Sequence, residues 1–442
     1  MNTERLRIEK IAMGGMGLGF WQDKAIFVPN TAIGDEIDFE ITLEKKDHAF
    51  AKAVKFHQRG EGVIPVKCEA FEGKEPCGAC DWLMLDYPTQ LKYKHNLVQE
   101  LFREQSIEVD PVIPSPQENH YRNKVYMPVG EGYSYGMFAR YSHQIVEHET
   151  CLNHPPIFDE IARTLMQLCR KAKVEIYNEE SHKGCLRHIG LRCNRDQSEI
   201  LLILVCRNGR LPFSKTITQG LIEAFPQIVG IVQNINRERG NVILGPEEKL
   251  LWGRDYLKDT LSEISFRIHY RSFWQVNPDT MEEILNLMRA ELKGSKRLID
   301  AYCGIGAIGL SLASSLEALL GIEELGAAID DAKQNAADNG FENTRFIAGK
   351  FEQMITQISE EFAADAIVLD PPRSGVPQSS LWAIRKAEIN KILYLSCSPM
   401  SLARDMKILL TGDKYKLKSL HCFDMFPNTW HIESLAVFEI QK

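Results

Sequence analysis

From about residue 261 onward, the sequence alternates helical segments with short apolar runs, and this pattern limits the folds available to the chain. The apolar runs lie at 298–302, 318–322, 366–370 and 392–396. Helices that alternate with buried strands are typical of a parallel, doubly wound α/β sheet. Ligands bind such sheets beyond the carboxyl ends of the strands. We therefore expect several distant segments to meet in one site there.

A glycine-rich segment coincides with the end of the first apolar run. From Arg297 to Gly309 the sequence reads Arg-Leu-Ile-Asp-Ala-Tyr-Cys-Gly-Ile-Gly-Ala-Ile-Gly, which indicates a strand, a tight loop and the start of a helix. Glycines in such a loop allow close approach of the backbone to a ligand. Glu323 follows roughly 20 residues later, the spacing expected of a ribose-binding acid. These features alone fit NAD as well as S-adenosylmethionine.

Three later motifs favour a methyltransferase over a dehydrogenase. Asp370 leads into Pro371-Pro372, Cys397 lies within Ser-Cys-Ser-Pro, and Glu433 lies near the C-terminal end. A thiolate that adds to carbon 6 of uracil makes carbon 5 nucleophilic enough to accept a methyl group. A carboxylate can then remove the proton from carbon 5. This interpretation makes Cys397 the nucleophile and Glu433 the base, although a lone cysteine is more often just a small buried residue.

Four further cysteines form a second pattern. Cys77 and Cys80 make a Cys-x-x-Cys motif, Cys68 precedes it by nine residues, and Cys151 follows about seventy residues later. Four thiolates can hold either zinc or an iron–sulfur cluster, and the spacing does not decide between them. Four unrelated reduced thiols are the remaining alternative.

In their order and number, these motifs resemble those of the S-adenosylmethionine-dependent RNA uracil-5-methyltransferases. The chain is most similar to the 23S ribosomal RNA members that carry an N-terminal TRAM domain and an iron–sulfur cluster. The resemblance covers essentially the whole chain. In the catalytic half it rests on seven motifs, at 272–277, 300–306, 370–375, 396–399, 403–405, 424–427 and 431–433. Two positions depart from the family pattern: Ser398, which is often Asn, and Ala307, which is polar in some members.

The resemblance implies a role for each motif residue. It makes Cys397 the nucleophile and Glu433 the base for carbon 5. It also implies a site for S-adenosylmethionine formed by Gln275, Tyr302, Gly304, Glu323 and Asp370. For the cysteines it selects a 4Fe-4S cluster over zinc, held by Cys68, Cys77, Cys80 and Cys151. Methyl transfer needs no redox step, so we expect this cluster to have a structural or RNA-positioning role.

We predict three domains in this α/β protein. Residues 1–58 have short apolar runs separated by Gly turns, as in an OB-like β-barrel, and resemble the TRAM module. Residues 59–260 are expected to form a strand-rich central α+β domain with the cysteines and an RNA-binding surface. Residues 261–442 are expected to form the Rossmann-like methyltransferase domain. A helical pattern near 87–105 could pack on that catalytic domain.

The charge pattern gives mixed evidence for an RNA partner. The net charge of −8 is unlike that of a typical nucleic-acid-binding protein. However, residues 161–220 carry eleven Lys or Arg against five Asp or Glu, among them Arg187, Arg192, Arg195, Arg207 and Arg210. A basic face of this kind would bind phosphates, whereas the alternative is a set of solvated strand faces. Tyr121, Phe138 and Tyr141 could stack on RNA bases, although such residues more often belong to the core.

The sequence predicts the cellular compartment of the protein more firmly than its RNA substrate. Its cysteine content favours a reducing compartment, and no apolar stretch has the length of a membrane span. We expect a cytoplasmic monomer without a membrane partner. The TRAM-like unit and the four cysteines favour 23S ribosomal RNA, with the uridine of the transfer-RNA T-loop as the alternative. Methylation of an amino nitrogen on adenine or guanine, or RNA binding by a non-catalytic iron–sulfur protein, are further alternatives.

Overall fold

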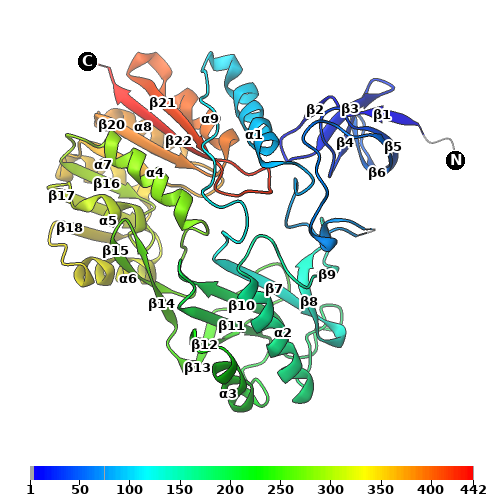
Figure 1. Ribbon diagram of the computed structural model, residues 1–442. Coiled ribbons are helices and arrows are strands. Elements are labelled where there is room, and N and C mark those ends of the chain that lie inside the picture. The colour runs from blue at the N-terminus through cyan, green and yellow to red at the C-terminus, as the bar shows by residue number, and fades with distance from the viewer. Residues whose placement is uncertain (1–3, 74, 442) are drawn as a thin grey trace.

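The computed structural model describes residues 4–73 and 75–441 (Figure 1). Its N-terminal strands form one six-stranded sheet in the order β1-β5-β6-β4-β3-β2. Alternate residues such as Leu6, Ile8, Ile26 and Ile37 are buried in its own small core. The strands are β1 (Arg5–Arg7), β2 (Lys10–Ile11), β3 (Gly17–Trp21), β4 (Lys24–Val28), β5 (Glu36–Glu44) and β6 (His48–Gln58).

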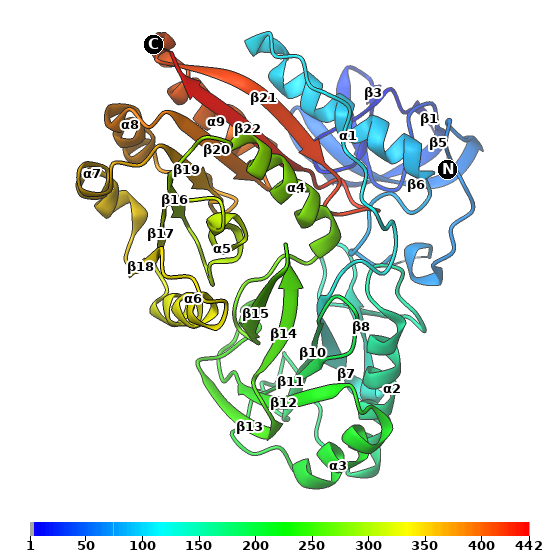
Figure 2. The same cartoon turned by 60° about the vertical axis from the view of Figure 1, so that its left-hand side comes forward.

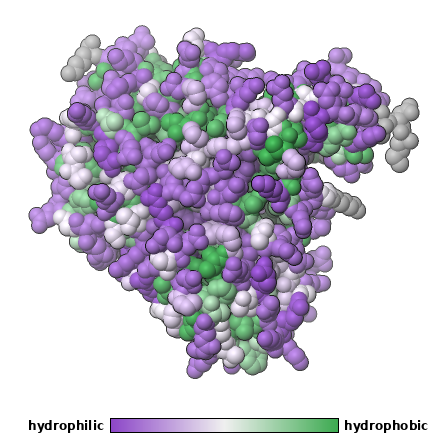
Figure 3. Space-filling view, viewed as in Figure 1, coloured by the Kyte–Doolittle hydropathy of each residue, from purple (hydrophilic) through white to green (hydrophobic). Residues whose placement is uncertain are grey.

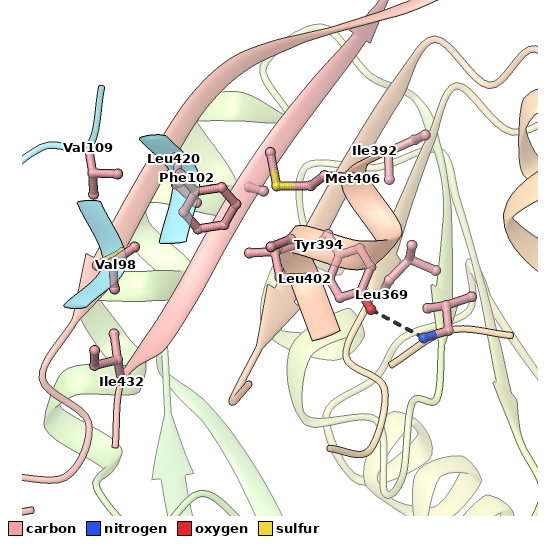
Figure 4. Packing of buried hydrophobic residues seen from close by; sticks show 14 of the residues in the cluster. Val98, Phe102, Val109, Leu369, Ile392, Tyr394, Leu402, Met406, Leu420 and Ile432 are labelled. Atoms are coloured by element: carbon pink, nitrogen blue, oxygen red, sulfur yellow. Dashed lines mark hydrogen bonds between the residues drawn. The ribbon is translucent and has the colours of Figure 1, made fainter. Parts of the chain in front are cut away.

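Helix α1 (Tyr87–Phe102) packs on the C-terminal part of the chain, although the two are widely separated in the sequence. The side chain of Asp86 caps the helix by accepting a hydrogen bond from the backbone N–H of Thr89 at 2.8 Å. Val98 and Phe102 lie in one core cluster with Leu402 of α9 (Pro399–Leu409), as Figure 4 shows. A 3-10 turn at Arg103–Gln105 ends the helical stretch, and another lies at Glu69–Phe71.

The central region is a seven-stranded sheet in the order β13-β12-β11-β10-β7-β8-β9. Helices α2 (Pro156–Lys171) and α3 (Ser214–Ala224) pack on it, and Ile161 and Leu165 of α2 share a core with Ile189 and Leu202 of the sheet. The strands are β7 (Lys124–Gly130), β8 (Ser134–Phe138), β9 (Ile145–Glu147), β10 (Leu186–Cys193), β11 (Ile200–Cys206), β12 (Ile228–Ile235) and β13 (Glu247–Gly253), with a 3-10 turn at Glu131–Tyr133.

A hairpin joins the central sheet to the C-terminal sheet. It consists of β14 (Tyr256–Leu261) and β15 (Ile264–His269), so the predicted boundary at 260/261 lies inside β14. Leu257 and Phe266 are buried in a core that also contains Val232 of the central sheet and Leu285 of the C-terminal part. The two regions therefore share apolar contacts at the hairpin, which explains why no polar linker marks the boundary in the sequence.

The C-terminal sheet has the order β18-β17-β16-β19-β20-β22-β21. The first five strands are parallel, and β22 is antiparallel to both of its neighbours. The strands are β16 (Arg297–Ala301), β17 (Ala318–Glu323), β18 (Thr344–Ala348), β19 (Ala366–Leu369), β20 (Lys391–Ser396), β21 (Tyr415–Phe423) and β22 (Glu433–Ile440). The four predicted apolar runs are therefore β16, β17, β19 and β20.

Helices cover both faces of this sheet (Figure 2). Successive side chains of β16 are buried on opposite faces of the sheet. Leu298 belongs to the core under α4 and α5, and Ile299 belongs to the core under α8 and α9. Burial on both faces explains the continuous apolar runs in the sequence. The helices are α4 (Pro278–Glu291), α5 (Ala307–Ala313), α6 (Gly326–Asp338), α7 (Phe351–Phe362), α8 (Gln378–Ala387) and α9, with a 3-10 turn at Thr411–Asp413.

Polar side chains cover most of one face of the molecule. Hydrophilic residues dominate the face seen in Figure 3, with smaller apolar areas between them. Within residues 4–73 and 75–441, no helix is both long and apolar enough to span a membrane.

Candidate active site

The register between β20 and β22 brings Cys397 and Glu433 together. Ser396, the last residue of β20, pairs with Ser434 in the antiparallel ladder. Cys397 follows the last residue of β20, and Glu433 is the first residue of β22. Both side chains line the same cavity, and the charge of Glu433 contributes to raising the pKa of the Cys397 thiol. Two residues that are distant in sequence are thus neighbours at the edge of the ladder.

All seven residues predicted for catalysis or cofactor binding line one cavity. The cavity has a volume of about 750 Å³ and lies at the carboxyl ends of the parallel strands. This is where a doubly wound sheet is expected to hold its ligand. The seven residues are Gln275, Tyr302, Gly304, Glu323, Asp370, Cys397 and Glu433.

The glycine loop after β16 supplies one wall of this cavity. Tyr302 and Gly304 both have positive φ angles, +64° and +54°, so the chain turns sharply at this point. Glu323 is held against the loop, because its carboxylate accepts hydrogen bonds from the backbone N–H of Gly304 at 3.2 Å and of Leu325 at 2.9 Å. The carboxylate of Glu323 is therefore fixed at the cavity wall, at the end of β17.

Buried Asp300 supports the same loop from beneath. Its Oδ2 accepts a hydrogen bond from the backbone N–H of Gly309 at 2.8 Å, and a Cβ atom at position 309 would lie only 2.7 Å from that oxygen. A glycine is therefore needed for this close approach. Burial raises the pKa of Asp300 to about 8.

The reacting groups favour their neutral forms inside the cavity. Burial, together with the charges of Glu433 and Asp370, raises the pKa of the Cys397 thiol to about 11, while Arg373 opposes this shift. Burial also raises the pKa of Asp370 to about 7. The pKa of Glu433 is raised well above its ordinary value by burial and by Asp370, again against the effect of Arg373. Arg373 is thus the cation that favours ionisation of both Cys397 and Glu433.

Several lining residues had no assigned role in the sequence analysis. Arg373 and Phe426 belong to the recognised motifs at 370–375 and 424–427, so their motifs pointed to them although their roles were not stated. The other unassigned residues include Phe273, Leu325 and Phe351, of which Phe273 and Leu325 are each 67% exposed. Phe273 lies in the motif at 272–277, which pointed to it although its role was not stated. No motif marked Leu325 or Phe351, because their place at the cavity depends on the tertiary fold.

An outer groove adjoins the cavity. It has a volume of about 830 Å³ and shares Arg373 with the cavity. Arg122, Arg140, Tyr141 and Trp430 also line it, and Tyr141 is 87% exposed. Phe138 is stacked on His143 at the groove, with ring centroids 5.0 Å apart. Aromatic and cationic side chains thus surround the approach to Arg373.

The structure corrects part of the predicted RNA-binding surface. Tyr121 is buried, and its hydroxyl donates a hydrogen bond to the backbone carbonyl of Pro427 at 3.0 Å, so it is not a free stacking platform. Arg187 and Arg192 are also buried, and their guanidinium groups donate to backbone carbonyls. Arg195 is paired with Asp279. Two of the five named arginines therefore serve internal contacts, since buried guanidinium groups need hydrogen-bond partners, whereas Arg195 and Arg210 remain exposed.

The four predicted metal-ligating cysteines line one small cavity. Cys68, Cys77, Cys80 and Cys151 all contribute to it, and all four are free thiols. Nearby Cys151 contributes to raising the pKa of the other three, after burial. Four thiols around one small cavity fit the ligand set of a cluster or of a structural metal.

Two histidines beside Cys151 were not anticipated. Burial opposes ionisation of Cys151, but its hydrogen bond with His154 and the charges of His154 and His148 lower its pKa to about 7. The ligand atoms of His148, Cys151 and His154 lie within 4.8 Å of one another. Both histidines approach the carboxylate of Asp159, at 3.3 and 3.0 Å. The close spacing of His148, Cys151 and His154 in the sequence could have indicated these two histidines.

Comparison with known families places this site in context. Residues 86–441 match the family described as tRNA (Uracil-5-)-methyltransferase. The chain belongs to this family. It is accordingly a member of the S-adenosylmethionine-dependent RNA uracil-5-methyltransferases, as the resemblance of its motifs had indicated.

Similar proteins match over almost the entire chain. A protein from Halalkalibacterium halodurans named as an RNA methyltransferase is 36% identical over 445 residues, which covers 98% of this chain and 96% of the relative. A similarly named protein from Bacillus cereus is 35% identical, with 97% and 95% covered. Among solved structures, the Pyrococcus abyssi tRNA (uracil-54, C5)-methyltransferase in complex with S-adenosyl-L-homocysteine matches with a TM-score of 0.82 and 25% identity, covering 98% of this chain and 100% of that one.

Proposed function

We propose that this protein transfers a methyl group from S-adenosylmethionine to carbon 5 of a uridine in RNA through a covalent adduct on Cys397. The observation that supports the proposal is that Cys397, at the end of β20, and Glu433, at the start of the neighbouring β22, line the same cavity. A thiol and a carboxylate on one face are the two groups that this reaction needs.

The chain's own residues account for the bond changes at the pyrimidine. The Cys397 thiolate bonds to carbon 6, and the electron pair of the carbon 5–carbon 6 double bond moves onto the ring as an enolate. Carbon 5 would then bond to the methyl group, as the bond between that methyl group and the sulfonium sulfur breaks and leaves its electron pair on the sulfur. Glu433 removes the proton left on carbon 5, the double bond re-forms, and the bond between sulfur and carbon 6 breaks to release the thiolate. Covalent catalysis thereby divides one difficult substitution into two easier steps.

The cavity fits the cofactor that the family uses. S-adenosylmethionine supplies the methyl group, on a positively charged sulfonium. Glu323, fixed by the glycine loop, is placed to accept hydrogen bonds from a ribose. Exposed Phe273 and Leu325 offer apolar surface at the same cavity, suited to a flat base. Tyr302, Gly304, Gln275 and Asp370 complete the set that we assign to this ligand.

Arg373 has two functions in this scheme. Its charge lowers the pKa of Cys397 and so favours the thiolate that attacks carbon 6. It also lowers the pKa of Glu433, and so favours the carboxylate that removes the proton. Because Arg373 lines both the cavity and the outer groove, it can in addition contact the RNA backbone beside the target uridine.

We propose 23S ribosomal RNA as the substrate, on the basis of the N-terminal six-stranded sheet and the four-cysteine unit. The second candidate is the T-loop uridine of transfer RNA, which is favoured by the likeness to a tRNA uracil-54 enzyme. A uridine inside a helix would have to leave the stack to reach Cys397. Mapping 5-methyluridine in both RNAs from cells that lack this protein distinguishes the two candidates by which RNA loses the modification.

We propose that Cys68, Cys77, Cys80 and Cys151 hold a 4Fe-4S cluster. The four free thiols around one small cavity support this assignment. The cluster would cross-link the segment around Cys77 to the distant segment around Cys151. No step of the methyl transfer passes through it.

Trapping with RNA that contains 5-fluorouridine at the target tests the reaction. Fluorine cannot leave as a proton, so the methylated RNA should stay attached to the protein through Cys397. Cys397→Ala should form no adduct. If that variant kept its methyltransferase activity, the product would be a base methylated on an amino nitrogen. A wild-type protein that neither forms an adduct nor binds S-adenosylmethionine would instead be a non-catalytic RNA-binding protein.

A further inference from the structure

The loop at 424–432, between β21 and β22, separates the catalytic cavity from the outer groove. Phe426 lines the cavity, whereas Trp430 and His431 line the groove. The loop leads directly into Glu433. Burial, together with the charge of Arg373, lowers the pKa of His431 to about 4, so its ring is uncharged at neutral pH. The 424–432 loop therefore contributes to the walls of both the cavity and the groove.

Four successive carbonyl groups of the loop accept hydrogen bonds from donors elsewhere in the chain. The donors are the Asn277 amide to Met425 O at 3.2 Å, Lys94 Nζ to Phe426 O at 3.0 Å, the Tyr121 hydroxyl to Pro427 O at 3.0 Å, and the backbone N–H groups of Asp81 and Trp82 to Asn428 O at 2.9 and 3.1 Å. Buried backbone carbonyl groups need hydrogen-bond donors. In this loop the donors belong to other segments of the chain, which therefore hold the loop in place.

The first residue of the loop, Asp424, forms an ion pair in which both side chains are fully buried. Lys94 Nζ of α1 lies 2.5 Å from Asp424 Oδ1, and both side chains have an exposed fraction of 0%. Burial lowers the pKa of Lys94, and the contact with Asp424 opposes this. A buried ion pair is a poor source of stability, because the cost of removing both charges from water offsets their attraction. Its geometric effect is to fix the start of the loop against α1.

Two further sets of contacts hold the loop, one from α1 and one from the segment that carries the cysteines. Gln90 of α1 accepts a hydrogen bond from the backbone N–H of Asn428 at 2.9 Å and donates to the side chain of Asn428 at 3.2 Å. Asp81, which follows Cys80 directly, accepts a hydrogen bond from the backbone N–H of Trp430 at 3.2 Å. The four-cysteine unit is therefore one residue from a direct contact with this loop.

We propose that Lys94, Tyr121 and Asp81 are positioning residues that hold the 424–432 loop as a rigid wall of the catalytic cavity. Through this loop, α1 and the four-cysteine segment set the place where the target ring lies between Phe426 and Cys397. The inference rests on the proposed function of Cys397. It assigns to a region outside the catalytic domain a direct influence on the rate of adduct formation.

Tyr121→Phe provides the sharpest test, because it removes one hydroxyl and keeps the ring. Tyr415→Phe is the matched control: Tyr415 is equally buried, and its hydroxyl also donates to a backbone carbonyl, that of Ile389 at 2.7 Å. Both variants should lose similar stability on thermal unfolding. Tyr121→Phe should slow adduct formation with 5-fluorouridine RNA about tenfold, because small displacements in an active site are costly to the rate. Tyr415→Phe should leave this rate unchanged, and both should bind S-adenosylmethionine as the wild type does.

The outcomes separate this inference from the proposed function. If the wild type forms no adduct, the proposed function fails. If the wild type forms the adduct and Tyr121→Phe forms it as fast as Tyr415→Phe, the positioning role is overturned. A double variant, Lys94→Met with Asp424→Asn, removes both buried charges together and should show the same slow adduct formation with normal cofactor binding. Equal losses of cofactor binding and adduct formation in Tyr121→Phe would indicate general damage and would also overturn the role.

Discussion

The raised pKa of Cys397 makes a quantitative prediction for the RNA-free protein. With a thiol pKa of about 11, only about one molecule in a thousand carries a thiolate at pH 8. An ordinary cysteine with a pKa of about 8.5 is about one quarter ionised at that pH, roughly 250-fold more. The more basic thiolate is intrinsically more nucleophilic, which offsets about tenfold of this difference. Alkylation of Cys397 by iodoacetamide should therefore be about 20-fold slower than that of an unperturbed thiol.

The pH dependence is the more decisive measurement, because it does not depend on access to the thiol. The alkylation rate of the peptide containing Cys397, followed by mass spectrometry, should rise about tenfold for each pH unit between pH 7 and pH 10. Arg373→Met removes the cation that lowers the thiol pKa, so this variant should react more slowly throughout that range. Cys397→Ser identifies the peptide. A rate that levels off below pH 9 would refute our account of the cavity electrostatics.

Three further predictions follow from the site. Glu433→Gln should still form the methylated adduct on uridine RNA but release it about 10²- to 10⁴-fold more slowly, as quenched time courses would reveal; normal turnover would place the base elsewhere. Replacing Cys77 and Cys80 with Ser should remove iron and brown colour, measured by metal analysis and absorbance, whereas a colourless native protein that contains zinc would exclude the cluster. Asp300 has a folded pKa of about 8 against roughly 4 when unfolded, so its ionisation lowers stability as pH rises between these values. Asp300→Asn should flatten the dependence of the melting temperature on pH across that window, and an unchanged dependence would contradict the assignment.

The sequence was most informative where one segment carries its own signal. The apolar runs at 298–302, 318–322, 366–370 and 392–396 are strands β16, β17, β19 and β20, because burial on both faces leaves a continuous apolar pattern. Cys397 and Glu433 could be singled out because each lies in a motif, at 396–399 and 431–433, that the family resemblance ties to a thiol nucleophile and a carboxylate base. Their adjacency was not readable, since it depends on the antiparallel pairing of β22 with β20.

Residues whose environment depends on distant contacts were harder to interpret. Arginine and tyrosine are residue types expected at an RNA-binding surface. Arg187, Arg192 and Tyr121 are nevertheless buried, and each donates a hydrogen bond to a backbone carbonyl. A long polar side chain looks the same in sequence whether its polar end reaches solvent or an internal carbonyl. Lys94 is a similar case, since only the tertiary structure places Asp424 beside it.

The pairing of β20 with β22 also limits where insertions and deletions can occur in this part of the sequence. The 35 residues between Cys397 and Glu433 include α9 and β21, and an insertion in the turn at 411–413 that joins these two elements need not disturb the reacting pair. One residue gained between Glu433 and Ser434 would instead turn the carboxylate to the opposite side of the sheet. Natural variants and engineered grafts should therefore tolerate changes of length near 411–413, between α9 and β21, but not in the 424–432 loop or immediately after Glu433.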